Sequence, residues 1–448
     1  MQNGTLFTED FLREGILQTS DWQALSPIEV DAAKSALRKI FAPFHSGAQH
    51  NEADTEERII YPVLSALGWE NLILRKNTMA EKGRDDVPDA LLLPDDASLK
   101  LADKSKQAAH KFRCGVVICE AKKWEQPLDQ GKGDQVPSTQ MLRYLTRADV
   151  MSEGRILWGI LSNGRKWRLY WQRAKSRLEQ FVEFDLGALL NIKDYDADLF
   201  APAKEETDHL LTVFILMFRR AAFLPTRDKG RTFHEVALEE GRLWEARVAK
   251  NLSDLVFDKV FPDFVRAIAA ASPSSPLEEV RKAALTLLYR LLFILYAEDR
   301  DLLPKRDKRY ADYGLFKRVR LEVGQRIDDG ETFSAKAPHY WNHARTLFRI
   351  VDEGDPGIGL PPYNGGLFDR KDHWLLDDIE IPDAALAPLL DKLSRTQGPE
   401  PKLISYRDLS VQQLGSIYER LLEYEPVRGE DGAIEVRLNP FARKGSGS

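Results

Sequence analysis

Two short motifs, each placing an acidic residue beside an apolar run, constrain this chain more than any other feature. Pro88-Asp89 precedes the run Ala90–Leu93, and Glu120-Ala121-Lys122 follows the run Val116–Cys119. Short apolar runs bounded by polar residues are typical of buried strands. Two adjacent strands with these motifs at their ends would bring the two carboxylates together, and carboxylate oxygens are the ligands that Mg²⁺ prefers.

Lys122 adds a positive charge to this pair. It lies two residues after Glu120, so the two side chains share one face of the strand. An acidic pair, a divalent cation and a lysine together suit the hydrolysis of a phosphodiester bond.

Residues 54–68 carry apolar side chains at helical spacing. Asp54, with Glu57 three residues later, forms a capping box and predicts that the helix begins at Asp54. Glu56 stands on the apolar stripe, where a carboxylate needs a cation or a hydrogen-bond donor. Glu56 is therefore a third candidate ligand. The alternative is that it only occupies the first helical turn, where the helix dipole favours a negative charge.

Size and composition predict a protein of about two or three domains. The 448 residues are 43% hydrophobic and carry a net charge of −6, which argues mildly against a passive DNA coat but allows local basic patches. Cys114 and Cys119, the two cysteines, fall on opposite faces of one expected strand, so we expect no disulfide and a cytoplasmic location. No apolar stretch reaches the roughly 20 residues that span a bilayer.

The first half of the chain reads as an α/β domain over residues 27–200, with residues 1–26 as an arm. Ser26 and Pro27 predict the start of a helix that runs to residue 41. Asn163-Gly164 between two apolar runs predicts a hairpin, and another helix begins at Ser138. Residues 94–111 have no apolar period and read as an exposed loop, with a short helix within it as the alternative. Strands are expected at 71–74, 89–93, 112–120, 156–161, 165–171 and 182–184.

The second half, residues 201–448, reads as a mainly α-helical domain. Apolar residues recur there at helical spacing. Helices are expected at 208–223, 234–255, 261–271, 277–303 and 410–424.

The order of these motifs resembles the amino-terminal half of Type IIG-like restriction–modification proteins, in which a PD-(D/E)XK nuclease is fused to an adenine-specific DNA methyltransferase. The resemblance covers nearly the whole chain, and the order is more specific than any single motif. The motifs are Thr55-Glu56-Glu57, Pro88-Asp89, Glu120-Ala121-Lys122, Gln140-x-x-x-Tyr144, Leu161-Ser162-Asn163-Gly164-Arg165-Lys166-Trp167, Tyr296-Ala297-Glu298-Asp299-Arg300, Tyr363-Asn364-Gly365-Gly366-Leu367-Phe368 and Leu414-Gly415-Ser416-Ile417-Tyr418-Glu419.

The resemblance implies a Mg²⁺-dependent endonuclease, for which Mn²⁺ can substitute, acting on double-stranded DNA in phage defence. Asp89, Glu120 and Glu56 would be the metal ligands, together with the carbonyl of Ala121. Lys122 would stabilise the charge of the transition state. Gln140 would contact the lysine or a phosphate, the alternative being an exposed helix face. Cleavage of both strands in such folds often requires a dimer.

The resemblance also implies that residues beyond 200 connect the nuclease to a methyltransferase. The glycine-rich cofactor loop and the Asn-Pro-Pro-Tyr motif of that enzyme do not occur here; Leu360-Pro361-Pro362-Tyr363 lacks the asparagine. We therefore expect no methylation and no S-adenosylmethionine binding by this chain alone, and a separate methyltransferase part as partner. The alternative function is a non-cutting DNA-binding or regulatory arm of such a methyltransferase.

Other groups of residues have plainer interpretations. His339 and His343 are four apart and could share a metal on a helix, but no third ligand stands out. The acidic run Glu298–Asp301 ends a helix, where we expect a structural link to Arg290 or a neighbouring helix. Basic residues that could contact DNA are Arg165, Lys166, Arg168, Arg173, Lys175, Arg177, Arg219, Arg220, Arg227, Lys229 and Arg231.

Overall fold

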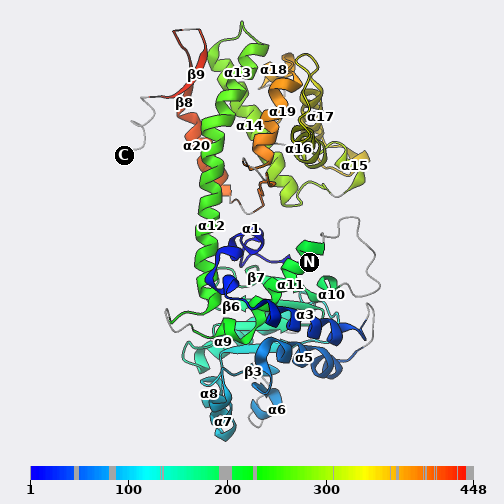
Figure 1. Cartoon of the computed structure of the whole chain (residues 1–448), viewed down its shortest axis with the longest axis vertical. Coiled ribbons are helices and arrows are strands. Elements are labelled where there is room, and N and C mark those ends of the chain that lie inside the picture. Colours follow the sequence, from blue (N-terminus) through cyan, green and yellow to red (C-terminus); the bar gives the residue numbers. More distant parts are fainter. Residues whose placement is uncertain are drawn as a thin grey trace. The chain divides into compact units, whose positions relative to one another are not determined.

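The computed structural model divides into two compact units, Met1–Trp244 and Glu245–Ser448, which are described separately (Figure 1). The structure describes residues 2–44, 50–79, 87–131, 133, 136–190, 204–225, 230–305, 307–363, 365–369, 373–396, 398, 401–407, 409, 411–430 and 432–439. The expected turn at 81–86 and the basic residues Arg227 and Lys229 lie outside these ranges.

The first unit is built on a mixed sheet with the strand order β1-β7-β6-β5-β4-β3-β2. β4 and β5 are parallel, and the other neighbouring pairs are antiparallel. The parallel pair is joined through helix α9 (Pro137–Met151), as a crossover connection requires. The strands are β1 (Gln2–Asn3), β2 (Ile73–Arg75), β3 (Ala90–Leu92), β4 (Val117–Ala121), β5 (Trp158–Ser162), β6 (Lys166–Trp171) and β7 (Phe181–Asp185).

Apolar side chains leave β4 on both faces, so the sheet is covered on both sides. Val117 and Cys119 join a core with α3 (Pro27–Phe41), the helical segment 52–69 and α11 (Lys204–Phe218). Ile118 joins the opposite core with α9. That second face also carries α7 (Asp96–Lys104) and α8 (Ala108–Phe112), which contribute Ala102 and Phe112.

The limits of the first unit differ from the expected domain of residues 27–200. Residues 1–26 were expected to form an arm outside this domain, but Phe11 of α1 (Glu9–Arg13) is buried in the core of the first unit. Phe214 of α11 packs edge-on against Trp167 of the sheet. The apolar face of α11 therefore belongs with the sheet, and the boundary between the compact units falls after residue 244.

Several local expectations are confirmed, and others are wrong. Helix α3 and the β5–β6 hairpin lie where the sequence placed them. The charged segment expected as a loop contains α7 and α8, because Asp95 caps the first of these helices by accepting from Ser98 N. The strand expected from residue 112 begins at Val117, so Cys114 precedes the strand; both cysteines are free.

The helix expected to begin at Asp54 begins two residues earlier. Asn51 is the N-cap, and its Oδ1 accepts from Asp54 N at 2.8 Å. The helical segment continues through α4 (Glu52–Thr55), the π-helical turn Glu56–Ile60, α5 (Tyr61–Leu64) and the turn Ser65–Trp69, in which Gly68, with a φ of +88°, leaves the helical conformation. This shift places Glu52 in the first helical turn.

The second unit is mainly helical, as expected, with one antiparallel hairpin that the sequence analysis did not foresee, β8 (Tyr424–Arg428) and β9 (Ile434–Leu438). Its core is centred on α14 (Leu277–Asp299), most of which is buried. The other principal helices are α13 (Phe261–Ala271), α17 (His339–Glu353), α18 (Trp374–Asp378), α19 (Asp383–Ser394) and α20 (Val411–Leu422); α12 (Phe233–Leu255) begins in the first unit.

The acidic run at the end of α14 makes structural links, but not to Arg290. Glu298 Oε1 accepts from Tyr310 Oη and from Leu315 N. Asp299 Oδ1 accepts from Arg320 Nη1 at 2.7 Å, and Asp299 Oδ2 accepts from Tyr406 N. Among the described helices, none is both long and apolar enough to cross a membrane.

His234 at the start of α12 generates a prediction about acid stability. The ring is fully buried between Trp158 and Phe223, at centroid distances of 4.7 and 4.4 Å. Its Nε2 lies 2.8 Å from the carbonyl of Met217 and therefore donates to it. Burial lowers the pKa of His234 to about 4 from an ordinary 6.5.

Below pH 6.5 the unfolded chain binds a proton that the folded ring refuses, so stability is lost as pH falls from 6.5 towards 4. The loss is on the order of 3 kcal/mol by pH 4. His234→Gln removes the titration. Urea unfolding of the first unit at pH 7.5 and 4.5 should show a smaller loss in the variant than in the wild type; equal losses would contradict the assignment.

Candidate functional site

The structure brings together the two acidic residues that end neighbouring strands. β3 and β4 are antiparallel, with Ala90 opposite Cys119, so Asp89 and Glu120 occupy the next position along the pair. Asp89 N donates to Glu120 Oε2 at 3.3 Å, and Ala121 N donates to Asp89 Oδ2 at 2.9 Å. It is the amide of Ala121 that contacts this site; a role for its carbonyl as a metal ligand stays a prediction.

Lys122 shares the face of Glu120, as its spacing predicts. Lys122 Nζ donates to Glu120 Oε1 at 2.6 Å, and both side chains are buried, Glu120 with 1% of its surface exposed. The charge of each residue is therefore balanced by the other inside the protein. Breaking one half of such a buried pair leaves the partner without compensation.

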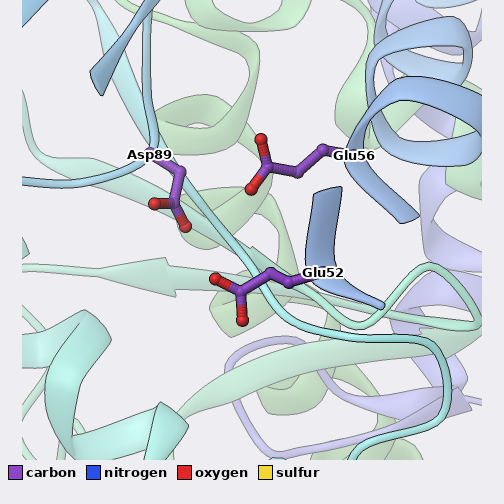
Figure 2. A group of neighbouring side chains, drawn as sticks. All are labelled: Glu52, Glu56 and Asp89. Carbon is purple, nitrogen blue, oxygen red and sulfur yellow. The ribbon is translucent and has the colours of Figure 1, made fainter. Parts of the chain in front are cut away.

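Three carboxylates meet beside this pair. One oxygen from each of Glu52, Glu56 and Asp89 lies within 4.8 Å of the others, a grouping that can hold a cation (Figure 2). Figure 2 shows Glu52 and Glu56 reaching from the helical segment 52–69 toward Asp89. Sequence reasoning named Glu56 but missed Glu52, because the capping box placed Glu52 outside the helix. The signal was the spacing of four between the two glutamates, which puts them on one helix face.

Burial and neighbouring charges raise the pKa values of Glu120 and Glu56. Burial, reinforced by the charge of Asp89, raises the pKa of Glu120 to about 8 in spite of Lys122. Burial and Asp89 also raise the pKa of Glu56, whose Oε2 accepts from Tyr61 Oη at 3.1 Å. A raised carboxyl pKa means that the ionised form is disfavoured in the empty site, and a bound cation would offset that cost.

The thiol of Cys119 responds to the same charges. It is fully buried on β4, and burial together with the charge of Asp89 raises its pKa well above the ordinary value. The side chain stays a neutral thiol and offers no thiolate to a metal or an electrophile.

Lys76 is a second cation at the site that sequence reasoning missed. It begins α6 (Lys76–Met79) and its backbone N donates to the carbonyl of Asp89 at 2.8 Å. Its Nζ lies 3.6 Å from Asp89 Oδ1. Burial lowers the pKa of Lys76, but the charges of Asp89 and Glu120 outweigh it and the net shift is upward. No motif marks this residue; the pairing of β2 with β3 places it.

Gln140 lies on α9, near the site, but with a different partner from the one expected. Its Nε2 donates to Tyr144 Oη at 2.9 Å. No hydrogen bond joins it to Lys122 among the described residues. Tyr144 is buried and close enough to Lys76 to raise the pKa of that lysine. Gln140 therefore borders the site through Tyr144, and a phosphate contact stays a prediction.

The loop after Lys122 is fixed by the helix on one side and by the hairpin turn on the other. Thr55 Oγ1 donates to Asn51 O at 2.8 Å and accepts from Trp124 N at 2.9 Å. Lys122 N donates to Ser162 O at 2.8 Å. A side chain at Gly164, which has a φ of +81°, would collide with Trp124 and Thr55 at 2.9 Å.

The basic residues near the hairpin are largely engaged by the protein itself. Arg168 is buried between Glu183 and Asp129, and Arg165 pairs with Asp185 and Glu125. Lys166 pairs with Glu183. Trp167 and Tyr170 are core residues. This hairpin is therefore a structural part of the sheet.

The two histidines of α17 do not form a metal site among the described residues. His339 Nδ1 lies 3.1 Å from Asp383 Oδ2, and the His339 side chain is largely exposed. In the described part of the chain, the side chains grouped closely enough to hold a metal ion are Glu52, Glu56 and Asp89 (Figure 2).

Comparison of the chain with protein-family models, curated proteins and solved structures gave no match. What the coordinates establish by themselves is a mixed α/β unit followed by a mainly helical one. The function is therefore argued from the geometry and charge of the site.

Thr55 generates a prediction about stability. Thr55→Val keeps the shape of the side chain but leaves the buried backbone N–H of Trp124 without its acceptor, the Thr55 hydroxyl. We expect the free energy of unfolding to fall by about 1–3 kcal/mol. Thr55→Ser keeps the hydroxyl and is the matched control, measured by urea unfolding of both variants. Equal stability of the two variants would show that this hydrogen bond does not hold the loop.

Proposed function

We propose that the first unit is a divalent-metal-dependent nuclease of the PD-(D/E)XK type that hydrolyses phosphodiester bonds of double-stranded DNA. The observation that carries the proposal is the meeting of Asp89 with Glu120 and Lys122 at the ends of adjacent strands. The carboxylates of Glu52 and Glu56 beside them supply the further oxygens that a hard cation requires.

In this proposal Asp89, Glu120 and Glu56 hold Mg²⁺ or Mn²⁺, with Glu52 as an additional ligand. Oxygens of Glu52, Glu56 and Asp89 lie within 4.8 Å of one another and are of the kind that such an ion prefers, and Glu120 lies next to Asp89. A bound divalent cation would polarise the phosphate and lower the pKa of an attacking water. The chain's own groups prepare the site, because hydrogen bonds from Asp89 N and Ala121 N fix the two carboxylates before any ligand enters.

Lys122 is proposed to stabilise the negative charge that develops on the phosphate. Burial by itself would lower the pKa of this ammonium, but the charge of Glu120 outweighs that effect and the net shift is upward, so Lys122 stays charged at neutral pH. A preorganised cation in a site shielded from water stabilises a transition state more than a solvated one. Lys76, whose Nζ lies 3.6 Å from Asp89 Oδ1, is proposed to neutralise a second phosphate oxygen.

We further propose the setting that the motif order implies. The chain would act in the cytoplasm as part of a restriction–modification or related phage-defence system, beside an adenine-specific methyltransferase part that binds S-adenosylmethionine. Two copies would be needed to cut both strands. The helical second unit would be the connector between the two activities.

Cleavage tests this function. Asp89→Asn and Lys122→Met should each reduce plasmid cleavage in Mg²⁺ or Mn²⁺ by about a hundredfold or more, since each removes a charge from the reacting centre. Glu57→Gln is the matched control, because Glu57 is adjacent to Glu56 but exposed and paired with Arg75. The assay is run with and without the adjoining methyltransferase part. Full activity in both site variants would sink the proposal.

One observation favours the alternative of a non-cutting arm. Both oxygens of Glu120 already accept hydrogen bonds within the protein, one from Lys122 and one from Asp89 N. In a scaffold these bonds would be permanent and no ion would bind.

Metal titration separates the two functions. Calorimetry with Mn²⁺ should show binding to the wild-type chain and a loss of about tenfold or more in affinity for Glu56→Gln, which removes one ligand charge. Glu57→Gln should bind as the wild type does. Absence of carboxylate-dependent binding would favour the scaffold.

A further inference from the structure

A second candidate site lies in the helical unit, in a pocket that the proposed nuclease chemistry does not use. It occupies about 370 Å³ between α14, α17, α18 and the segment 365–369, all of them in the second unit. Its volume falls at the lower end of the range of small-molecule pockets, roughly 300–1,000 Å³. Its lining residues are Arg290, Trp341, Asn342, Arg345, Thr346, Phe348, Arg349, Phe368, Leu376 and Asp377.

Arg290 forms the buried end of this pocket. With 4% of its surface exposed, its guanidinium donates from Nε to Leu367 O at 2.8 Å and from Nη2 to Asp369 O at 3.4 Å. Its Nη1 donates to no described residue, and no carboxylate within the described chain forms an ion pair with it. Backbone carbonyls fix the orientation of the group but do not cancel its charge.

Two aromatic rings flank the same guanidinium. The Phe348 and Phe368 centroids lie 5.3 and 5.6 Å from the central carbon of Arg290. Burial lowers the pKa of Arg290 to about 10, partly offset by the charges of Asp377, Asp352 and Asp369, so the group remains charged at neutral pH. A fixed, desolvated cation with an open donor is suited to bind an anion.

Two further arginines stand at the mouth of the pocket. Arg345 and Arg349 are one turn apart on α17 and therefore share a face. Like charges at this spacing repel each other, and neither arginine forms an ion pair with a described residue that would offset the repulsion. The described lining residues include three arginines and one acidic residue, Asp377. The lining is net positive.

The lining also contains apolar side chains, which are fixed and expose little of their surface. Trp341 is fully buried, and its Nε1 donates to Ile379 O at 2.7 Å. Phe348, Phe368 and Leu376 complete the apolar part of the lining. A ligand that matches this pocket carries an anion at one end and a flat or apolar body at the other.

We propose that this pocket binds the phosphoryl group of a nucleotide, with the guanidiniums of Arg290, Arg345 and Arg349 around the phosphate and the base against the apolar wall. Guanidiniums offer paired donors that match phosphate oxygens, and aromatic walls accept a base. The phosphate can belong to a free nucleotide or to a DNA strand, and the chemistry of recognition is the same for both. The inference is independent of the proposed nuclease.

Calorimetry on the full chain in EDTA tests the site without any cleavage. The probes are AMP, adenosine, inorganic phosphate and a short DNA duplex. Arg345→Gln combined with Arg349→Gln removes the two outer charges. Arg345 is partly exposed, Arg349 is exposed, and neither forms an ion pair with a described residue, so the fold should persist, which thermal unfolding by circular dichroism checks. Arg318→Gln is the matched control, because Arg318 is an exposed arginine of the same unit that pairs with Glu322.

The wild type should bind AMP more tightly than inorganic phosphate, and adenosine should not bind. The double variant should bind AMP about tenfold more weakly or worse, while the control binds as the wild type does. If only duplex binding weakens in the double variant, and its salt dependence falls, the phosphate belongs to DNA. If neither AMP nor duplex binding differs between the double variant and the control, the proposal is overturned.

Discussion

The buried ion pair between Glu120 and Lys122 is the interaction on which the candidate site depends. Removing two charges from water is costly, and the cost is met only when geometry and hydrogen bonds are good. Here the pair lies 2.6 Å apart, and the second carboxylate oxygen accepts from the backbone of Asp89. That bond requires the register that sets Ala90 opposite Cys119. A slip of one residue between β3 and β4 would turn Glu120 and Lys122 to the wrong face.

The surroundings of this pair are rigid because three chain segments cross-brace one loop. Thr55 holds the backbone of Trp124 from the helix side, and Ser162 holds the backbone of Lys122 from the neighbouring strand. The turn at Gly164 packs so closely against Thr55 and Trp124 that a side chain is excluded at position 164. The hairpin motif that first appears to be a mere strand connection is thus part of the support of the site. Preorganisation of this kind is what a charged reaction centre requires.

Much of the fold near the site follows from local sequence signals. Ser26-Pro27, Asn163-Gly164 and the apolar runs beside Asp89 and Glu120 place α3, the hairpin and the two central strands. The site residues that the sequence analysis missed were hidden for one of two reasons, either a competing helix cap or a partner distant in the sequence. Asn51 outcompeted Asp54 as the cap and hid Glu52, while Lys76 reaches Asp89 only through the pairing of β2 with β3. The apolar face of α11 predicts that the helix is buried, but not which core it packs against, because that depends on tertiary contacts.

The buried thiol on β4 has a practical consequence. Cys119 is fully buried on β4 and keeps its proton, whereas alkylating reagents attack only the thiolate. Modification therefore requires the sheet to open at this strand and expose the sulfur to solvent. Cys114, also buried, lies outside the strand and has a hydrogen bond to His110 O. The rate at which each sulfur is labelled would time the local opening of the protein at two points, one of them beside the acidic site, with no added probe.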